Sequence, residues 1–239
     1  FVKSMFADKN FRNSINMSGV NSINWARIVF QIVYYYFSYF KIAKASEKIN
    51  FSVPTGNFGD IYAGYVSKKM GLPINKLVIA TNKNDILKRV INTGHYKPLE
   101  VEHTVSPSMD IQVASNFERL LFEIYDRDGT EISRHMEALS SDGGYTIDTK
   151  RLERTRSLFT GVAIDETQTR NEMKRVHAET GLLIDPHTAV GIAAGRAHLA
   201  TNDGPVISLA TADPAKFPDS VESATGQRPK PPERLAEAL

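Results

Sequence analysis

Hydrophobic and polar positions alternate along this chain in a way that predicts strands and helices in turn. Residues 49–53 alternate between apolar and polar side chains, and residues 77–80 form a short continuous apolar run, so both segments are predicted strands. Residues 61–70 between them have helical character and stop at Gly71, the residue type expected after a helix end. A strand, a loop, a helix and a second strand in about 30 residues make one βαβ unit.

The same reading predicts the rest of the elements. Residues 100–148 are more polar and less periodic, and we interpret them as a polar insertion that contains one clear amphipathic helix. Residues 219–239 are rich in proline and charge, which is typical of a loose tail. Alternating strands and helices predict an α/β fold, with a mainly parallel sheet and helices on both faces. Further helices are predicted at residues 25–40, 84–92, 115–125, 148–157, 167–180 and 188–199, and further strands at 181–184 and 206–210.

The most apolar stretch, WARIVFQIVYYYFSYF at residues 25–40, contains Arg27 and Gln31. A helix that crosses a membrane needs about 20 apolar residues, so we interpret this stretch as a buried helix whose aromatic residues belong to the core. Asn24 is its predicted N-cap. The helix at residues 188–199 is rich in alanine and glycine, which predicts close packing against it.

Composition excludes several classes of function. The chain has 239 residues and a net charge of +2, which gives no electrostatic reason to expect a nucleic acid partner. It has no cysteine, so disulfides, thiolate zinc sites and cysteine nucleophiles are excluded, and its histidines show no metal-binding spacing. Nothing near Phe1 resembles a signal peptide. We expect a cytoplasmic protein with no metal and no membrane partner, and the abrupt start without methionine suggests a piece of a longer protein.

Three polar loops follow predicted strands, at residues 54–60, 80–85 and 210–217, where ligands bind in parallel α/β sheets. In the first, PTGNFGD, Gly56 and Gly59 permit a sharp turn and close approach to an anion at a helix N-terminus. We expect a hydroxyl contact from Thr55, an aromatic wall from Phe58 and a helix cap from Asp60. The alternative is an ordinary turn. No Lys-Ser or Lys-Thr follows, and no G-x-G-x-x-G occurs, so nucleoside triphosphates and dinucleotides are disfavoured.

Four motifs in order carry a resemblance to a known family: NSINWAR at 21–27, PTGNFGD at 54–60, DPHTAVG at 185–191 and TADPAKF at 211–217. The chain resembles threonine synthase, a pyridoxal-phosphate enzyme of the tryptophan-synthase-β fold type, over roughly the C-terminal half of such an enzyme. The resemblance implies conversion of O-phospho-L-homoserine and water to L-threonine and phosphate. It also implies that residues 1–48 end a smaller cofactor-site domain, residues 49–218 form the large phosphate-binding domain, and residues 219–239 are the tail.

The resemblance implies roles for individual residues. Contacts to the cofactor, pyridoxal 5'-phosphate, are expected from Gly56, Asn57, Phe58, Gly59 and Asp60 near its phosphate and from Thr211 at its pyridine nitrogen. Contacts to the substrate are expected from Asn21, Ser22, Asn24 and Arg27. The family's Schiff-base lysine lies in a Ser-Phe-Lys-Asp-like motif that does not occur here. No catalytic residue is therefore assigned in this chain, and the missing N-terminal half of the same enzyme is its expected partner, without which the chain is expected to be inactive.

Other interpretations stay open. Without the resemblance, Thr211 is a turn cap, Asn21 and Ser22 are helix caps, and Arg27 is a surface residue paired with an acid. His187 is expected only to help start the following helix, and Asp213 stands where the family usually has histidine. The alternative functions are a related phospho-lyase that releases phosphate without making threonine, a non-catalytic phosphate-binding module, and a purely structural or partner-binding domain.

Overall fold

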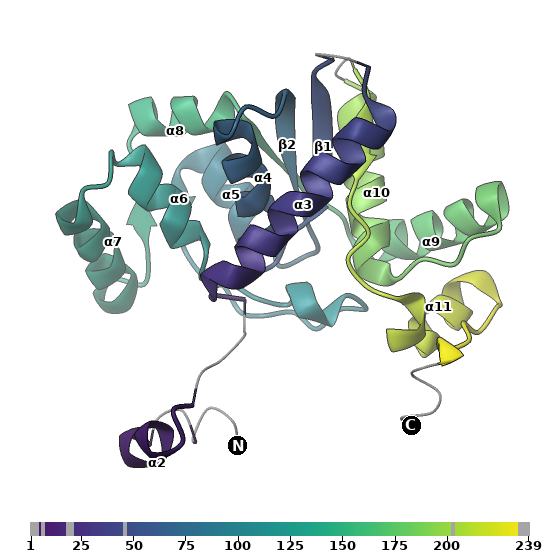
Figure 1. Cartoon of the computed structure of the whole chain (residues 1–239), viewed down its shortest axis with the longest axis horizontal. Coiled ribbons are helices and arrows are strands. Elements are labelled where there is room, and N and C mark those ends of the chain that lie inside the picture. The colour runs from purple at the N-terminus through teal and green to yellow at the C-terminus, as the bar shows by residue number, and fades with distance from the viewer. Residues whose placement is uncertain (1–4, 6–7, 18–21, 45–46, 202–203, 234–239) are drawn as a thin grey trace.

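A parallel sheet forms the centre of the protein (Figure 1). The computed structural model describes residues 5, 8–17, 22–44, 47–201 and 204–233. Among them the sheet has four strands in the order β5-β2-β1-β6. Its strands are β1 (Ile49–Pro54), β2 (Ile74–Thr81), β5 (Phe159–Ala163) and β6 (Val206–Ser208), and every neighbouring pair is parallel.

The strand order reverses beside β1. The chain builds outward from β1 through β2 to β5 and then returns to place β6 on the other side of β1. In parallel α/β sheets such a reversal opens a crevice beyond the carboxyl ends of the two strands that flank it. The topology therefore directs attention to the loops that follow β1 and β6.

The two faces of the sheet bury different sets of side chains, as expected from a period of two. Phe51, Val53, Leu77 and Ile79 belong to the core that contains α4 (Gly59–Lys69) and α5 (Ile86–Thr93). Val78 and Ala80 pack instead with Val190 and Ala194 of α10 (Pro186–Leu199). Helices thus cover both faces, and the predicted fold class is confirmed.

The helix α10 approaches the sheet closely. A Cβ on Gly191 would lie 2.8 Å from Cγ of Pro54, and the Ser52 hydroxyl donates to the Gly191 carbonyl at 2.6 Å. The close packing predicted from alanine and glycine is confirmed, and it places the second turn of α10 against the end of β1.

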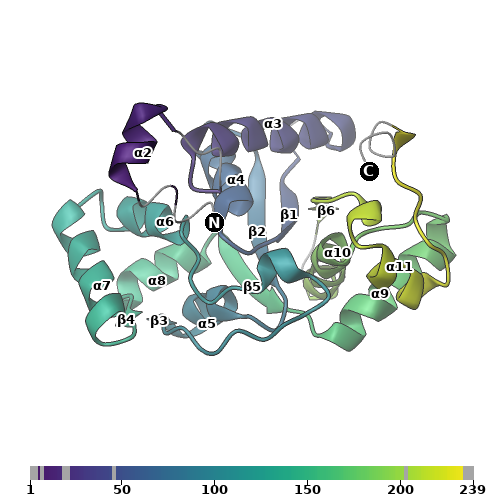
Figure 2. The same ribbon diagram turned by 90° about the horizontal axis from the view of Figure 1, so that it is seen from below.

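The aromatic helix α3 (Trp25–Ile42) packs beside α4, outside the sheet (Figures 1 and 2). Asn24 caps it as predicted, because its side chain accepts from the Ala26 N–H at 2.9 Å. Only Ile28, Tyr35 and Tyr39 are buried. The expectation of a buried aromatic helix is therefore wrong for the opposite face, where Phe30 is 71% and Phe40 is 74% exposed.

Several elements differ from the predictions. Residues 181–184 form no strand, because Gly181 ends α9 with φ of 73° and Asp185 then caps α10. The edge strand β5 and the helix α7 (Gly129–Ser141) were not predicted, and the tail contains α11 (Pro218–Thr225), anchored by buried Val221. Other elements are α2 (Lys9–Ser14), β3 (His95–Tyr96), η1 (Pro107–Met109), α6 (Phe117–Ile124), β4 (Tyr145–Thr146), α8 (Thr149–Arg156), α9 (Glu166–Thr180) and η2 (Pro214–Lys216).

A search for a membrane-crossing segment among the described helices finds none with the required length and apolar character. The described residues also contain no cluster of three or more histidine, aspartate or glutamate side chains arranged to hold a metal ion.

Candidate functional site

A cavity of about 350 Å³ opens at the carboxyl ends of β1 and β6, where the strand order reverses. Three segments build it: the loop after β1, the residues after β6 and the first half of α3. It is lined by Ser22, Arg27, Gln31, Tyr34, residues 54–60, Ala210 and Thr211. All six residues predicted to contact the cofactor lie on its wall, together with Ser22 and Arg27 from the predicted substrate set.

The loop after β1 presents unpaired main-chain donors to this cavity. Thr55 donates its N–H to the Ala80 carbonyl at 2.8 Å, but within the described part of the chain the N–H groups of residues 56–60 meet no protein acceptor. They precede and begin α4, so the partial positive charge of that helix end adds to them. The arrangement suits an oxyanion, and phosphate is the common guest at such a helix start.

Backbone geometry aims these donors. Phe58 occupies the N-cap position of α4 with φ of 65°, a left-handed conformation that is uncommon for a bulky residue. Its ring is 1% exposed and packs against Phe117 and Phe159, with centroids 5.2 and 5.8 Å away. Phe58 therefore anchors the loop in the core, and the expectation that its ring forms an aromatic wall for a ligand is wrong.

Gly56 is required by a close neighbour rather than by its own dihedral angles. A Cβ at this position would lie 2.8 Å from the carbonyl oxygen of Ser108 and 3.4 Å from Cα of Met109. Both contacts are to main chain, which cannot turn aside as a side chain can. The short helix η1 thus packs directly behind the glycine loop. No pattern in the sequence links residue 56 to residue 108, so this contact could not be predicted from it.

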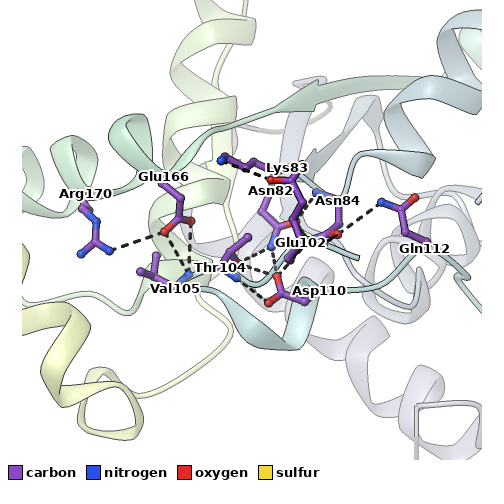
Figure 3. A network of polar contacts seen from close by, with 10 residues as sticks. All are labelled: Asn82, Lys83, Asn84, Glu102, Thr104, Val105, Asp110, Gln112, Glu166 and Arg170. Atoms are coloured by element: carbon purple, nitrogen blue, oxygen red, sulfur yellow. Dashed lines mark hydrogen bonds and ion pairs between the residues drawn. The ribbon is translucent and has the colours of Figure 1, made fainter. Parts of the chain in front are cut away.

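A polar network holds that backing segment to the sheet (Figure 3). The carboxylate of Asp110 accepts from the side chains of Asn82 at 2.8 Å and Asn84 at 3.1 Å, both in the loop after β2. It also accepts from the N–H and hydroxyl of Thr104, at 2.8 and 2.7 Å. Glu166 accepts the Val105 N–H at 3.3 Å. The loop at 80–85, predicted to face a ligand, therefore serves here to fix residues 104–110.

Asp60 brings a carboxyl group to the cavity wall. Its Oδ1 atom is buried and has no hydrogen-bond partner among the residues that the structure describes. Burial raises the pKa of Asp60 from an ordinary 3.8 to about 7, with the Tyr35 hydroxyl opposing part of that rise. That hydroxyl donates to the main-chain carbonyl of Asp60 at 2.8 Å. Asp60 does not cap α4, so that expectation is wrong. A carboxyl that remains largely protonated below pH 7 is compatible with an anion beside it.

The first half of α3 supplies side chains to the open side of the cavity. Arg27, Gln31 and Tyr34 follow one another at helical spacing along one stripe. Arg27 is exposed, and within the described residues its guanidinium has no acidic partner at ion-pair distance. Gln31 and Tyr34 were not predicted. Their spacing of four and then three residues after Arg27, on one face of a largely apolar helix, is the signal that points to them.

The remaining predicted residues have varied placements. The side chain of Asn24 caps α3 and does not line the cavity, and Asn21 lies outside the described residues. The Thr55 hydroxyl donates its proton to the Val53 carbonyl at 2.6 Å, so the expectation that it donates to a ligand is wrong. Asp213 caps η2 through the Ala215 N–H and is not on the cavity wall.

Thr211, on the segment after β6, lines the same cavity as the glycine loop. It is exposed, and its N–H donates to the Thr188 hydroxyl at 3.2 Å. The cavity lining therefore combines unpaired N–H groups, a hydroxyl side chain and an exposed guanidinium. Such a set of donors suits a phosphorylated ligand.

The chain is similar in sequence and structure to known proteins. The family model described as "Threonine synthase, C-terminal" matches residues 188–239. Threonine synthase from Pseudomonas aeruginosa is 43% identical over 99% of this chain and 50% of its own length. The crystal structure of pyridoxal-phosphate-bound threonine synthase from Brucella melitensis superposes with a TM-score of 0.92 at 47% identity, over 99% of this chain and 51% of that one.

The yeast threonine synthase structure gives a TM-score of 0.90 at 40% identity. It covers 99% of this chain and 51% of the yeast chain. The chain thus spans about half the length of the curated relatives it matches. On this sequence and structural similarity, the chain is homologous to the threonine synthases, pyridoxal-phosphate enzymes of fold type II, over about half of their length.

Proposed function

We propose that this chain is the cofactor-phosphate-binding part of a threonine synthase, which converts O-phospho-L-homoserine and water to L-threonine and phosphate. One observation carries the proposal: unpaired main-chain N–H groups at residues 56–60 line the same cavity as Thr211, at the strand-order reversal. Sequence identity of about 40% to threonine synthases supports the same assignment.

The residues present fit pyridoxal 5'-phosphate. The loop amides suit a phosphate monoester, and the close approach of η1 at Gly56 leaves the anion side of the loop as the open side. Thr211 would place a hydroxyl at the pyridine nitrogen, where it tunes the ring differently from a carboxylate. When bound, this cofactor supplies an electron sink for the carbon atoms of the substrate.

Residues at the rim would bind the substrate. Arg27 offers a planar fork of donors to the carboxylate or phosphate of O-phosphohomoserine, and Ser22 lies beside it on the cavity wall. Asn24 would act by fixing the start of α3, since its side chain is committed to the Ala26 N–H. Neutral Asp60 would donate a hydrogen bond to a phosphate oxygen from the buried wall. The role of Asn21 remains a prediction from the family motif.

The amine that carries the cofactor would come from the other half of the enzyme. Of the described residues that line the cavity, none is a lysine, and the relatives are about twice as long as this chain. The outer face of α3, which we define as Phe30, Val33, Phe37 and Phe40, is apolar and 57–74% exposed. It adjoins the stripe of Arg27, Gln31 and Tyr34. A partner segment that buries this face would also close the cavity and exclude water from it.

A fusion enzyme tests the proposal. The N-terminal half of the Pseudomonas aeruginosa threonine synthase is placed before this chain, and threonine and phosphate are measured with O-phosphohomoserine. We expect both products from the fusion and neither from the 239 residues alone. The control is the same fusion with the Schiff-base lysine of the Pseudomonas half replaced by alanine. Turnover by the isolated chain would refute the assignment of the missing amine to the other half.

The same assay separates the alternatives. A phospho-lyase would release phosphate without threonine, because water is not held at the reacting carbon. A passive phosphate module would bind inorganic phosphate and pyridoxal 5'-phosphate with similar affinity, and the fusion would form no product. Equal affinity for pyridoxal 5'-phosphate in the wild-type chain and in a Gly56→Val variant that remains folded would contradict any role for the loop.

A further inference from the structure

A buried polar cluster lies at the start of α10, behind the cavity and not on its wall. It consists of Asp185, His187 and Thr188, which are 0%, 4% and 4% exposed. The carboxylate of Asp185 accepts from the main-chain N–H groups of His187 at 2.9 Å and Thr188 at 3.3 Å, as a helix cap does. It also accepts from Nδ1 of His187 at 2.8 Å and from the Thr188 hydroxyl. The two main-chain bonds are enough to cap the helix, so the two bonds from side chains are additional.

His187 connects Asp185 to the glycine-loop wall. Its Nε2 atom accepts the main-chain N–H of Ser108 at 3.1 Å, so Nε2 carries no proton and the ring proton is on Nδ1, donated to Asp185. The ring of Phe217 packs against it, with centroids 4.7 Å apart. Ser108 is the residue whose carbonyl stands 2.8 Å from a Cβ at Gly56. The imidazole therefore supports the segment that backs the phosphate loop.

Thr188 connects the same carboxylate to Thr211, which also lines the cavity. Its hydroxyl donates to Asp185 and accepts the Thr211 N–H at 3.2 Å. Burial alone would raise the pKa of Asp185, but the hydrogen bonds from His187 and Thr188 hold it below its ordinary value. The ionised, buried carboxylate of Asp185 is thus linked by hydrogen bonds to Ser108 through His187, and to Thr211 through Thr188.

We propose that Asp185, His187 and Thr188 are positioning residues that set the spacing between the phosphate loop and Thr211. This inference rests on the proposed function only in naming pyridoxal 5'-phosphate as the ligand that spans the two walls. A rigid ligand held at its phosphate and at its ring nitrogen is sensitive to the separation of the two contacts. Because each wall depends on a different side chain, the two walls can be disturbed separately.

Two variants disturb one wall each. His187→Asn keeps a donor near the place of Nδ1, facing Asp185, and removes the acceptor for the Ser108 N–H. Thr188→Val removes the hydroxyl that accepts from Thr211, and Thr188→Ser is its matched control because it keeps that hydroxyl. The affinities of the 239-residue chain for pyridoxal 5'-phosphate and for inorganic phosphate are measured by calorimetric titration. Hydrogen exchange at the Ser108 and Thr211 amides is measured by NMR.

We expect His187→Asn to speed exchange at Ser108 and to weaken both pyridoxal 5'-phosphate and inorganic phosphate by about tenfold, since a buried hydrogen bond is lost behind the anion site. Thr188→Val should speed exchange at Thr211 and weaken pyridoxal 5'-phosphate by about tenfold while leaving inorganic phosphate within twofold. Thr188→Ser should match the wild type. If Thr188→Val does not fold, Thr188→Ala takes its place.

Wild-type affinities and exchange rates in both folded variants would overturn the inference. So would an equal rise in exchange at both amides in each variant, since that reports general loosening of the fold. Failure of the proposed function has a different signature. The wild-type chain would then bind neither ligand, while exchange at Ser108 and Thr211 would still show whether each wall depends on its own residue.

Discussion

The protonation of Asp60 makes the stability of this protein depend on pH in an unusual direction. Burial raises the pKa of Asp60 to about 7 in the folded chain, from an ordinary 3.8 when the chain is unfolded. The folded state therefore holds a proton that the unfolded state releases between these values. The stabilisation is fully present below about pH 4 and is lost as the pH rises through about 7. Most carboxylates that pair in a fold act in the opposite sense.

The size of the effect follows from the same two values. Each tenfold change in proton affinity is worth 1.36 kcal/mol, so the rise in pKa from 3.8 to about 7 corresponds to about 4 kcal/mol. About 3 kcal/mol of this stabilisation is lost between pH 5 and 8. A loss of that size is a large part of the 5–15 kcal/mol that stabilises typical domains.

The variant Asp60→Asn isolates this contribution, because an amide of the same shape does not titrate. Urea unfolding of both proteins is followed at intervals from pH 5 to 8 in a buffer without phosphate. The difference between wild type and Asp60→Asn in the free energy of unfolding cancels the other titrating groups. Relative to Asp60→Asn, the wild type should lose about 3 kcal/mol of its free energy of unfolding between pH 5 and 8. Exposed Asp142→Asn serves as the control for loss of a surface carboxylate.

A difference that stays constant from pH 5 to 8 would refute the reasoning, since it would mean that burial does not hold a proton on Asp60. A difference that grows in favour of the wild type would mean that the carboxylate is stabilised by an unseen donor. The same protonation predicts that pyridoxal 5'-phosphate binds the wild type more weakly as the pH rises through about 7, relative to Asp60→Asn.

Three further changes test the packing of the site. Gly56→Ala should lower affinity for pyridoxal 5'-phosphate about tenfold in calorimetric titration, because its Cβ would meet main chain at 2.8 Å; Gly129→Ala, with no atom within 4 Å, should not. Gly64→Ala should destabilise the fold by about 1–3 kcal/mol in urea, since its Cβ would lie 2.7 Å from the Tyr35 ring; an unchanged or raised midpoint would contradict this. Asp110→Ala should cost about 1–3 kcal/mol by leaving buried donors unpaired, with faster exchange at residues 104–110; unchanged exchange there would show that the network is dispensable.

Elements with strong local signals were predicted from the sequence, and elements defined by their neighbours were not. The apolar run at 77–80 and the helix stop at Gly71 depend on residues close together in the chain, and β2 and α4 lie where expected. The apolar run at 181–184 was misassigned as a strand because Leu183 and Ile184 pack against Met173, Ala189 and Val221 of three helices and not in the sheet. The strand β5 was missed because a central glycine that accommodates Lys88 of α5 weakens its pattern.

The candidate site divides in the same way. Two glycines at the junction of a strand and a helix predicted a loop with unpaired N–H groups, since helix ends leave N–H groups unpaired wherever they occur. The sequence also placed Arg27 and Thr211 at the site, but only through the family resemblance. The exposed half of α3 went unrecognised because burial depends on how a helix is rotated against its neighbours, which hydrophobicity alone does not specify.

Contacts between residues far apart in the chain were settled by folding alone. Ser108 behind Gly56, the buried state of Asp60 and the links from Asp185 to both walls join segments separated by tens of residues. Local spacing carries the hydrophobic periodicity and the helix caps, because these act within a few residues. The cavity and the burial that raises the pKa of Asp60 arise only when strands β1 and β6 lie side by side and bring their loops together.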